Sequence, residues 1–116
     1  MKKNIVKEKS YSFAIQIVEL YKILIEKKEF VLSKQLLRSG TAVGALIQES
    51  EHAESKKDFI HKLSISLKEA NETIYWLNLL FDTKYINQVE FDKIHNLNIE
   101  LVRLLVTIIK SSKSNL

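Results

Sequence analysis

Residues 55–82 read SKKDFIHKLSISLKEANETIYWLNLLFD and carry the most regular hydrophobic spacing in the chain. Apolar side chains return there after four or three residues, at Phe59, Leu63, Leu67, Ala70, Ile74, Leu77 and Phe81. This heptad spacing predicts a long amphipathic helix that packs one face against other helices. Ser55 and Asp58 have the Ser-x-x-acid form of a capping box, which places the start of this helix near residue 56.

The N-terminal part of the chain predicts two more helices. Over residues 8–28 an inward stripe is formed by Phe13, Ile17, Leu20 and Leu24. A second stripe of Ala14, Val18, Tyr21 and Ile25 widens the apolar face, as expected of a helix with more than one neighbour. The next helix, about residues 33–54, should begin near Ser33, which could act as its N-cap, and end around Ala53 or Glu54.

A fourth helix is expected over residues 88–111, behind a capping box of Asn87 and Glu90. Its inward stripe should be Phe91, Ile94, Leu97, Leu101, Leu104 and Ile108. The chain has no proline and only two glycines, which permits long uninterrupted helices. Similar helix lengths and short connections favour antiparallel neighbours, so we predict an all-α fold: a single domain over residues 1–116, an antiparallel up-down-up-down four-helix bundle.

Composition excludes several classes of protein. The chain has no cysteine, which rules out disulfides and thiolate zinc sites. No stretch of 18 or more apolar residues suggests a membrane span, and no signal-peptide core follows the basic N-terminus, so a cytoplasmic location with no membrane partner is expected. The net charge of +4 tolerates a polyanionic partner without demanding one.

The segment Arg38–Ala45, with the sequence RSGTAVGA, is unusual for a helix because most of its residues are small. Each glycine inside a helix costs up to about 1 kcal/mol relative to alanine. Gly40 and Gly44 should therefore allow a close approach of another backbone, either within the bundle or from a second subunit. A phosphate-binding loop does not fit, because these residues lie inside a helix and no strand precedes them.

A family resemblance rests on this segment, on Glu49 and on residues 68–77, KEANETIYWL. The chain resembles the bacterial four-helix bundle proteins first noticed as reading frames within intervening sequences of 23S ribosomal RNA genes. The resemblance spans about residues 13–105. It departs from the family pattern at Gln48-Glu49, where the family often has Asn with Glu two positions later, and at Ala42, where Ser is common.

The resemblance implies a non-enzymatic protein that forms a ring-shaped homopentamer, with a poorly defined biochemical role. The family is also similar to the accessory bundle protein of diversity-generating retroelements, a basic pentamer that binds nucleic acid and a reverse transcriptase. RNA or DNA is therefore the partner that the resemblance suggests. No cofactor and no small-molecule substrate are expected.

Acidic residues could form a structural cluster with Arg38. Glu69 and Glu72 are three residues apart and share a helix face, and Glu49 lies on the helix that carries Arg38. The planar guanidinium suits carboxylates, so we expect interhelical or intersubunit ion pairs. Trp76, beside the inward face, is either a core edge or an interface anchor, and Tyr75 with Trp76 could also stack bases.

The sequence gives less support to a metal site or to catalysis. Each histidine follows an acid by three positions, as in carboxylate-bridged metal sites: Glu49 and His52, Asp58 and His61, Asp92 and His95. These pairs read better as flank or capping residues, so we predict no metal site. No nucleophile or histidine is placed by a recognisable catalytic motif, and we expect no enzyme activity.

Lysines should gather at one end of the bundle. In an up-down bundle the N-terminus, the connection near residue 55 and the C-terminus share one end, which would collect Lys2, Lys3, Lys7, Lys9, Lys56, Lys57, Lys110 and Lys113. Phosphate contacts dominate affinity for nucleic acid. The leading hypothesis is thus a non-catalytic oligomer that binds structured, rRNA-associated RNA through this end. The alternative is an adaptor for protein assembly without specific nucleic-acid binding.

Overall fold

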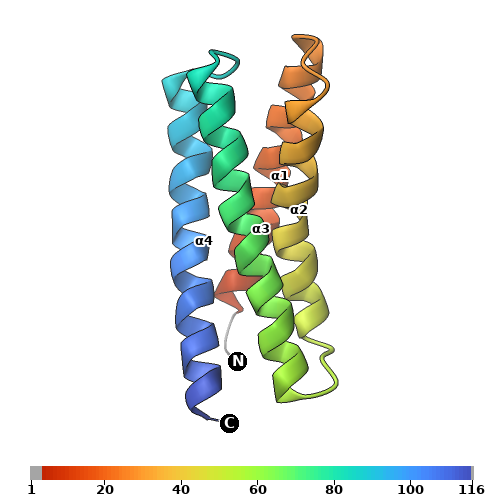
Figure 1. Cartoon of the computed structure of the whole chain (residues 1–116), viewed down its shortest axis with the longest axis vertical. Coiled ribbons are helices and arrows are strands. Elements are labelled where there is room, and N and C mark those ends of the chain that lie inside the picture. The colour runs from red at the N-terminus through yellow and green to blue at the C-terminus, as the bar shows by residue number, and fades with distance from the viewer. Residues whose placement is uncertain (1–3, 116) are drawn as a thin grey trace.

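The computed structural model describes residues 4–115, and four helices account for most of them. They are α1 (Ile5–Glu26), α2 (Leu32–Ser50), α3 (Lys56–Asp82) and α4 (Gln88–Ser114). Figure 1 shows them running alternately up and down beside one another. The predicted all-α four-helix bundle is confirmed.

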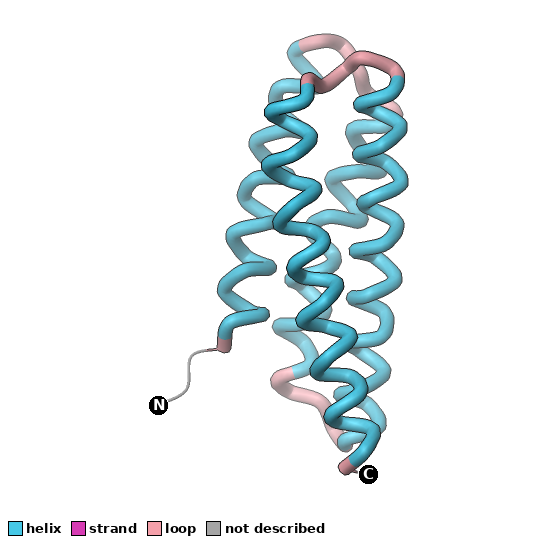
Figure 2. The backbone as a smooth tube through the Cα atoms, turned by 90° about the vertical axis from the view of Figure 1, so that its left-hand side faces the viewer, coloured by secondary structure: helices cyan, strands magenta, loops and turns pink. Residues whose placement is uncertain are grey.

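The connections decide which residues meet at each end of the bundle. The α2–α3 connection lies at the same end as the start of α1 and the end of α4, whereas the α1–α2 and α3–α4 connections lie at the opposite end (Figures 1 and 2). Lys28 and Lys84, in these last two connections, have φ values of 64° and 69°. This left-handed backbone ends the preceding helix and turns the chain back.

The helices α3 and α4 begin as their sequences predict. The Ser55 hydroxyl accepts a hydrogen bond from the Asp58 N–H at 3.0 Å. The Asn87 side chain accepts one from the Glu90 N–H at 2.8 Å, and the Glu90 carboxylate accepts one from the Asn87 N–H at 2.9 Å. Both caps satisfy N–H groups that have no partner within the helix.

The predicted start of α2, near Ser33, is within one residue of the observed start, whereas its predicted N-cap and its predicted end were wrong. The helix begins at Leu32, and Ser33 is not its N-cap. Instead, the buried carboxylate of Glu29 accepts hydrogen bonds from the N–H groups of Val31, Leu32 and Ser33, the last at 2.6 Å. The helix ends at Ser50, because the N–H groups of residues 51–53 bond to carbonyls only three residues back, in a tightened final turn.

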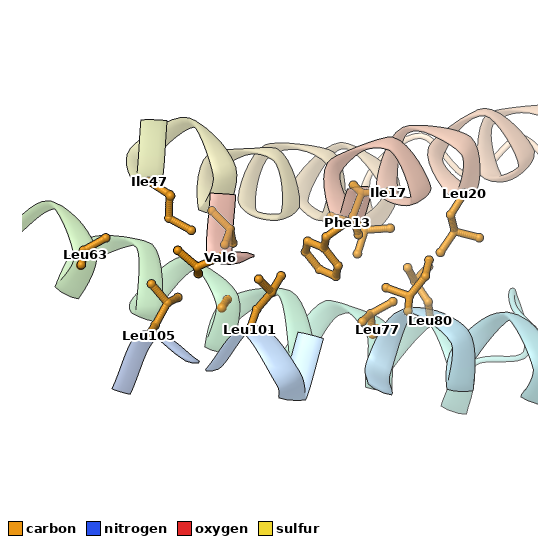
Figure 3. Packing of buried hydrophobic residues seen from close by; sticks show 14 of the residues in the cluster. Val6, Phe13, Ile17, Leu20, Ile47, Leu63, Leu77, Leu80, Leu101 and Leu105 are labelled. Atoms are coloured by element: carbon orange, nitrogen blue, oxygen red, sulfur yellow. The ribbon is translucent and has the colours of Figure 1, made fainter. Parts of the chain in front are cut away.

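Buried hydrophobic residues of all four helices form one core, part of which is shown in Figure 3. The inward stripe predicted for α1 is buried, at Phe13, Ile17, Leu20 and Leu24. On α4 the predicted stripe is displaced toward one side, since the buried residues are Ile94, Asn98, Leu101, Leu105 and Ile109. The expected Phe91, Leu97, Leu104 and Ile108 are only partly buried.

Helix α3 is rotated slightly from the orientation that its apolar heptad predicts. Leu63, Ala70 and Leu77 are buried as expected, but the other inward positions are Ile60, Ser66, Thr73 and Leu80. Small polar side chains take central positions because each bonds to a neighbouring helix or to its own backbone. Periodicity of apolar residues alone cannot find such positions.

Candidate functional site

Four lysines form an exposed group where α3 begins and α4 ends: Lys56, Lys57, Lys110 and Lys113. Asn98 of α4 bonds to Ala70 of α3, and the rings of Phe81 and Phe91 lie 4.8 Å apart. This antiparallel register sets the first turn of α3 level with the last turn of α4 (Figure 1). None of the four lysines belongs to an ion pair found within residues 4–115.

Lys7 and Lys9 lie at the same end but are engaged within the chain. Lys7 Nζ lies 2.9 Å from Glu51 Oε1, and its hydrogen bond lowers the pKa of Glu51. Lys9 Nζ lies 2.9 Å from Glu100 Oε2 and ties α1 to α4. Lys2 and Lys3 lie outside the described residues. Among the described residues, the lysine-rich end therefore combines four lysines without an ion pair and two that hold helices together.

The structure brings together Arg38, Glu69, Glu72 and Trp76 on the surface between α2 and α3. Arg38 Nη1 lies 3.1 Å from Glu69 Oε1, and Nη2 bonds to Glu72. Trp76 Nε1 donates to the same Glu72 carboxylate at 2.9 Å. The bond from Trp76, followed by that from Arg38, lowers the pKa of Glu72. These four side chains bond to one another within one chain, so the cluster holds α2 against α3.

Glu49 does not join the Arg38 cluster. Its carboxylate lies 3.1 Å from Lys62 Nζ, which is also an α2–α3 contact but near the other end of the interface. Residue 49 is three helical turns from Arg38, too far for the side chains to meet. Arg38 and Glu49 therefore do not pair within the chain, where Glu49 pairs with a cation of α3 instead.

Gly40 and Gly44 let α1 approach α2 closely. A Cβ atom at Gly40 would lie 2.8 Å from the Ile17 side chain, and one at Gly44 would lie 3.2 Å from the Ser10 carbonyl oxygen. Both contacts are within one chain. Gly40 and Gly44 are thus explained by packing inside the bundle.

Along the same pair of helices lies an open groove of about 760 Å³, lined among others by Tyr11, Ala14, Thr41, Gly44 and Ala45. The Tyr11 side chain stands at this groove and is 70% exposed. The groove is hollow because the residues beneath it are small.

Sequence reasoning missed a polar line on the outside of α3, which we call the outer line. It consists of Lys57, His61, Ser64, Lys68, Asn71, Tyr75 and Asn78. Intervals of four and three residues place all seven on one side of the helix, and all but the half-buried Ser64 are exposed. The same spacing is visible in the sequence, but it is a pattern of polar residues, whereas the helix was predicted from the spacing of its apolar residues.

Sequence reasoning also missed the polar contacts of the core. Ser66 Oγ donates to the Val43 carbonyl oxygen at 2.9 Å, and the hydroxyls of Thr73 and Ser39 are 2.9 Å apart. Asn98 Nδ2 donates to the Ala70 carbonyl oxygen at 3.2 Å, but its buried Oδ1 has no partner among the described residues.

Clusters of metal-ligating side chains and membrane-spanning helices are both absent from residues 4–115. That part of the chain holds no group of three or more acidic, histidine or cysteine side chains placed to share a metal ion. Nor does it hold a helix whose length and hydropathy would let it cross a bilayer.

The chain was compared with known proteins. Residues 2–107 match the family model described as 23S rRNA-intervening sequence protein. A crystal structure of a protein of unknown function from Bacteroides thetaiotaomicron, assigned to the S23 ribosomal protein family, is 57% identical with a TM-score of 0.89, covering 90% of this chain and 98% of that one. No curated protein matches the chain. The chain therefore belongs to the 23S rRNA-intervening sequence protein family.

Proposed function

We propose that this protein is a non-catalytic, homo-oligomeric bundle that binds structured RNA through its lysine-rich end. The observation that carries this proposal is the group of four exposed lysines, Lys56, Lys57, Lys110 and Lys113, for which no ion pair is found within residues 4–115. Lysines without carboxylate partners can exchange small counterions for phosphates, which is the main source of affinity for nucleic acid. The family description refers to 23S rRNA, which supports RNA as the polyanionic partner.

Assembly would strengthen such binding. A ring of five chains, each with a net charge of +4, would carry about +20 and present five lysine-rich ends. Light scattering on nuclease-treated protein gives the mass of the assembly, and the 260/280 absorbance ratio before treatment reports bound nucleic acid. A clean 13.5 kDa monomer would contradict the oligomeric part of the proposal.

The decisive test is a titration of a labelled RNA stem–loop at several salt concentrations. Each lost phosphate contact reduces the slope of log affinity against log salt by about 0.7–0.9. Replacing all four lysines by alanine should therefore reduce the slope by about three and weaken binding at least about tenfold at low salt.

A matched control removes four lysines from the other end of the bundle. It combines Lys22→Ala, Lys34→Ala and Lys93→Ala with Lys84→Asn, since asparagine tolerates the positive φ of Lys84. This variant has the same net charge as the first and should bind RNA almost as the unchanged protein does. Equal losses in both variants, or no binding by the unchanged protein at low salt, would contradict the proposal.

The groove between α1 and α2 favours a second candidate function, an adaptor for protein assembly without specific nucleic-acid binding. Tyr11 beside this groove is an exposed aromatic residue of the kind that anchors interfaces. An Ala45→Glu variant would block the groove. If it released a protein partner that remains bound after nuclease treatment, while RNA binding stayed weak in every variant, the adaptor would be the better description.

A further inference from the structure

The outer line of α3 continues the lysine-rich end along the side of the bundle. Lys57 belongs to both, and the line then rises through His61, Lys68, Asn71 and Tyr75 to Asn78. From Lys57 to Tyr75 the helix spans about 27 Å at 1.5 Å per residue. None of the seven side chains is a carboxylate.

Neighbouring helix positions add cations and keep carboxylates away. On α4, Arg103 is exposed above Lys110 and Lys113. Glu69 and Glu72 lie on the α2 side of α3 and are engaged by Arg38, and Glu100 is engaged by Lys9 of α1. Asp82 and Asp92 lie beyond Asn78, at the end away from the four lysines. Glu54 and Asp58 flank Lys57, and Asp58 accepts a hydrogen bond from the Glu54 N–H at 3.1 Å. From His61 to Asn78, a phosphate chain could therefore follow the outer line without meeting a free carboxylate among the described residues.

Tyr75 gives this basic surface an aromatic platform. Its side chain is 60% exposed, and its ring meets the Trp76 ring edge to face, with centroids 5.0 Å apart and planes at 78°. Trp76 is in turn held by its bond to Glu72. The Tyr75 ring is thus braced from one side while most of its surface stays available, which lowers the entropy lost when a base stacks on it.

We propose that the outer line of α3 binds an unpaired segment of RNA, with phosphates on Lys57 and Lys68 and one base stacked on Tyr75. The inference rests on the proposed function and deepens it by naming the form of RNA. A base inside a duplex has both faces covered by its neighbours, so only an unpaired base can stack on a protein ring. Asn71, one turn below Tyr75, can hydrogen-bond the edge of that base, and Asn78, one turn above, can accept through its Oδ1 while its Nδ2 donates to the Ile74 carbonyl oxygen at 2.9 Å.

The test compares a single-stranded oligoribonucleotide of about twelve nucleotides, within the span that such surfaces bind, with the duplex formed on its complement. Tyr75→Ala should weaken binding of the single strand about 5- to 150-fold, the range for loss of one stacked base. Tyr75→Phe should restore it, because phenylalanine keeps the ring. Binding of the duplex should be equal in all three proteins.

Tyr11→Ala is the matched control, since Tyr11 is also an exposed tyrosine but lies on α1. It should leave single-strand affinity unchanged. The one tryptophan of the chain, Trp76, reports occupancy independently, because a base stacked on the adjoining Tyr75 should change its fluorescence.

The outcomes separate this inference from the proposed function. If the fourfold lysine variant loses RNA but Tyr75→Ala binds the single strand as the unchanged protein does, the lysine-rich end stands and the outer line is refuted. Equal weakening by Tyr75→Ala and Tyr11→Ala would refute it as well. If the unchanged protein binds neither RNA at low salt, both fail together.

Discussion

The two sides of helix α3 use their polar residues in opposite ways. Toward α2, surface charges pair across the interface, as Arg38 does with Glu69 and Glu72, and buried hydroxyls such as Ser66 and Thr73 have hydrogen-bond partners. Toward α4, Asn98 keeps a buried oxygen without a partner in the described chain. On the surface beside that interface, Lys56, Lys57, Lys110 and Lys113 have no ion pair within residues 4–115.

This contrast separates residues that hold the bundle together from residues that can bind a ligand. A charged group already bonded within the chain must lose that bond before it can contact a phosphate, which offsets the gain. An unpaired exposed lysine has only water and small ions to release. The α2–α3 interface is therefore expected to govern stability, and the surface over α3 and α4 to govern binding.

The largest effect is expected inside the α2–α3 interface. Thr73→Val keeps the shape of the side chain but removes the hydroxyl that meets Ser39 Oγ at 2.9 Å. Ser39 is completely buried and would retain only a 3.5 Å contact to the Leu36 carbonyl oxygen. The free energy of unfolding, measured by urea denaturation, should fall by about 1–3 kcal/mol.

Thr107→Val is the control for Thr73→Val. The Thr73 hydroxyl lies 2.8 Å from the Glu69 carbonyl oxygen, four residues back, and the Thr107 hydroxyl makes the same kind of contact with Arg103 at 2.9 Å but is exposed on α4. Loss of the Thr107 hydroxyl should change the free energy of unfolding by less than about 0.5 kcal/mol. Similar costs at both positions would mean that the buried pair with Ser39 contributes nothing specific.

The α3–α4 interface should respond with the opposite sign. Asn98→Leu keeps the branching of the side chain and removes a fully buried amide whose Oδ1 has no partner within residues 4–115. The one bond lost is the 3.2 Å contact to the Ala70 carbonyl. We expect the free energy of unfolding to rise by about 1 kcal/mol, measured in the same urea titration. A loss of stability would show that Asn98 is better satisfied than this geometry indicates.

The contrast also explains what the sequence could and could not predict. Apolar periodicity found all four helices, and Ser55 and Asn87 located two helix starts, because these signals are local. The α2 cap could not be found in this way. Its donor groups bond to Glu29, a residue that reads as part of a charged run and becomes buried only when α1 and α2 pack.

The residues of the candidate site also differ in whether the sequence could predict their contacts. Charge complementarity and helix spacing were enough to expect Arg38 near Glu69 and Glu72. Whether each lysine forms an ion pair could not be predicted, because this depends on which residues of neighbouring helices lie side by side. Lys7 pairs with Glu51, 44 positions away in the sequence, whereas Lys57 forms no ion pair in the described chain. Polar core residues such as Ser66 escape prediction because composition marks them as surface residues.

A smaller effect is expected from the Arg38 cluster. Arg38→Met removes both ion pairs but keeps most of the side-chain volume. The Arg38 side chain is 48% exposed, so solvent screens the pairs and the loss of stability should be about 0.2–1 kcal/mol at neutral pH. Arg103→Met, an exposed arginine without an ion pair in the described chain, is the control and should have no measurable effect.

The effect of Arg38→Met should depend on pH in a defined direction. Trp76 and Arg38 hold the pKa of Glu72 below its ordinary value of 4.5, so their contribution is present above pH 4.5 and is lost as the pH falls through the lower, folded value. The stability difference between Arg38→Met and the unchanged protein should therefore shrink below pH 4.5. A difference that is constant down to pH 2 would mean that the lost stability comes from packing of the arginine stem.

The smallest effect is expected at Glu49, and it distinguishes local placement of charge from net charge. Glu49→Gln raises the net charge of the chain, +4, by one and frees Lys62, whose pKa Glu49 raises through their hydrogen bond. Asp82→Asn makes the same change of charge four residues beyond Asn78, at the end of the outer line. Because Asp82 continues the outer line and Glu49 lies over the α2–α3 interface, Asp82→Asn should tighten binding of single-stranded RNA about twofold and by more than Glu49→Gln does. Equal tightening by both would mean that RNA responds to the whole charge of the bundle, and that the two sides of α3 do not differ as ligand surfaces.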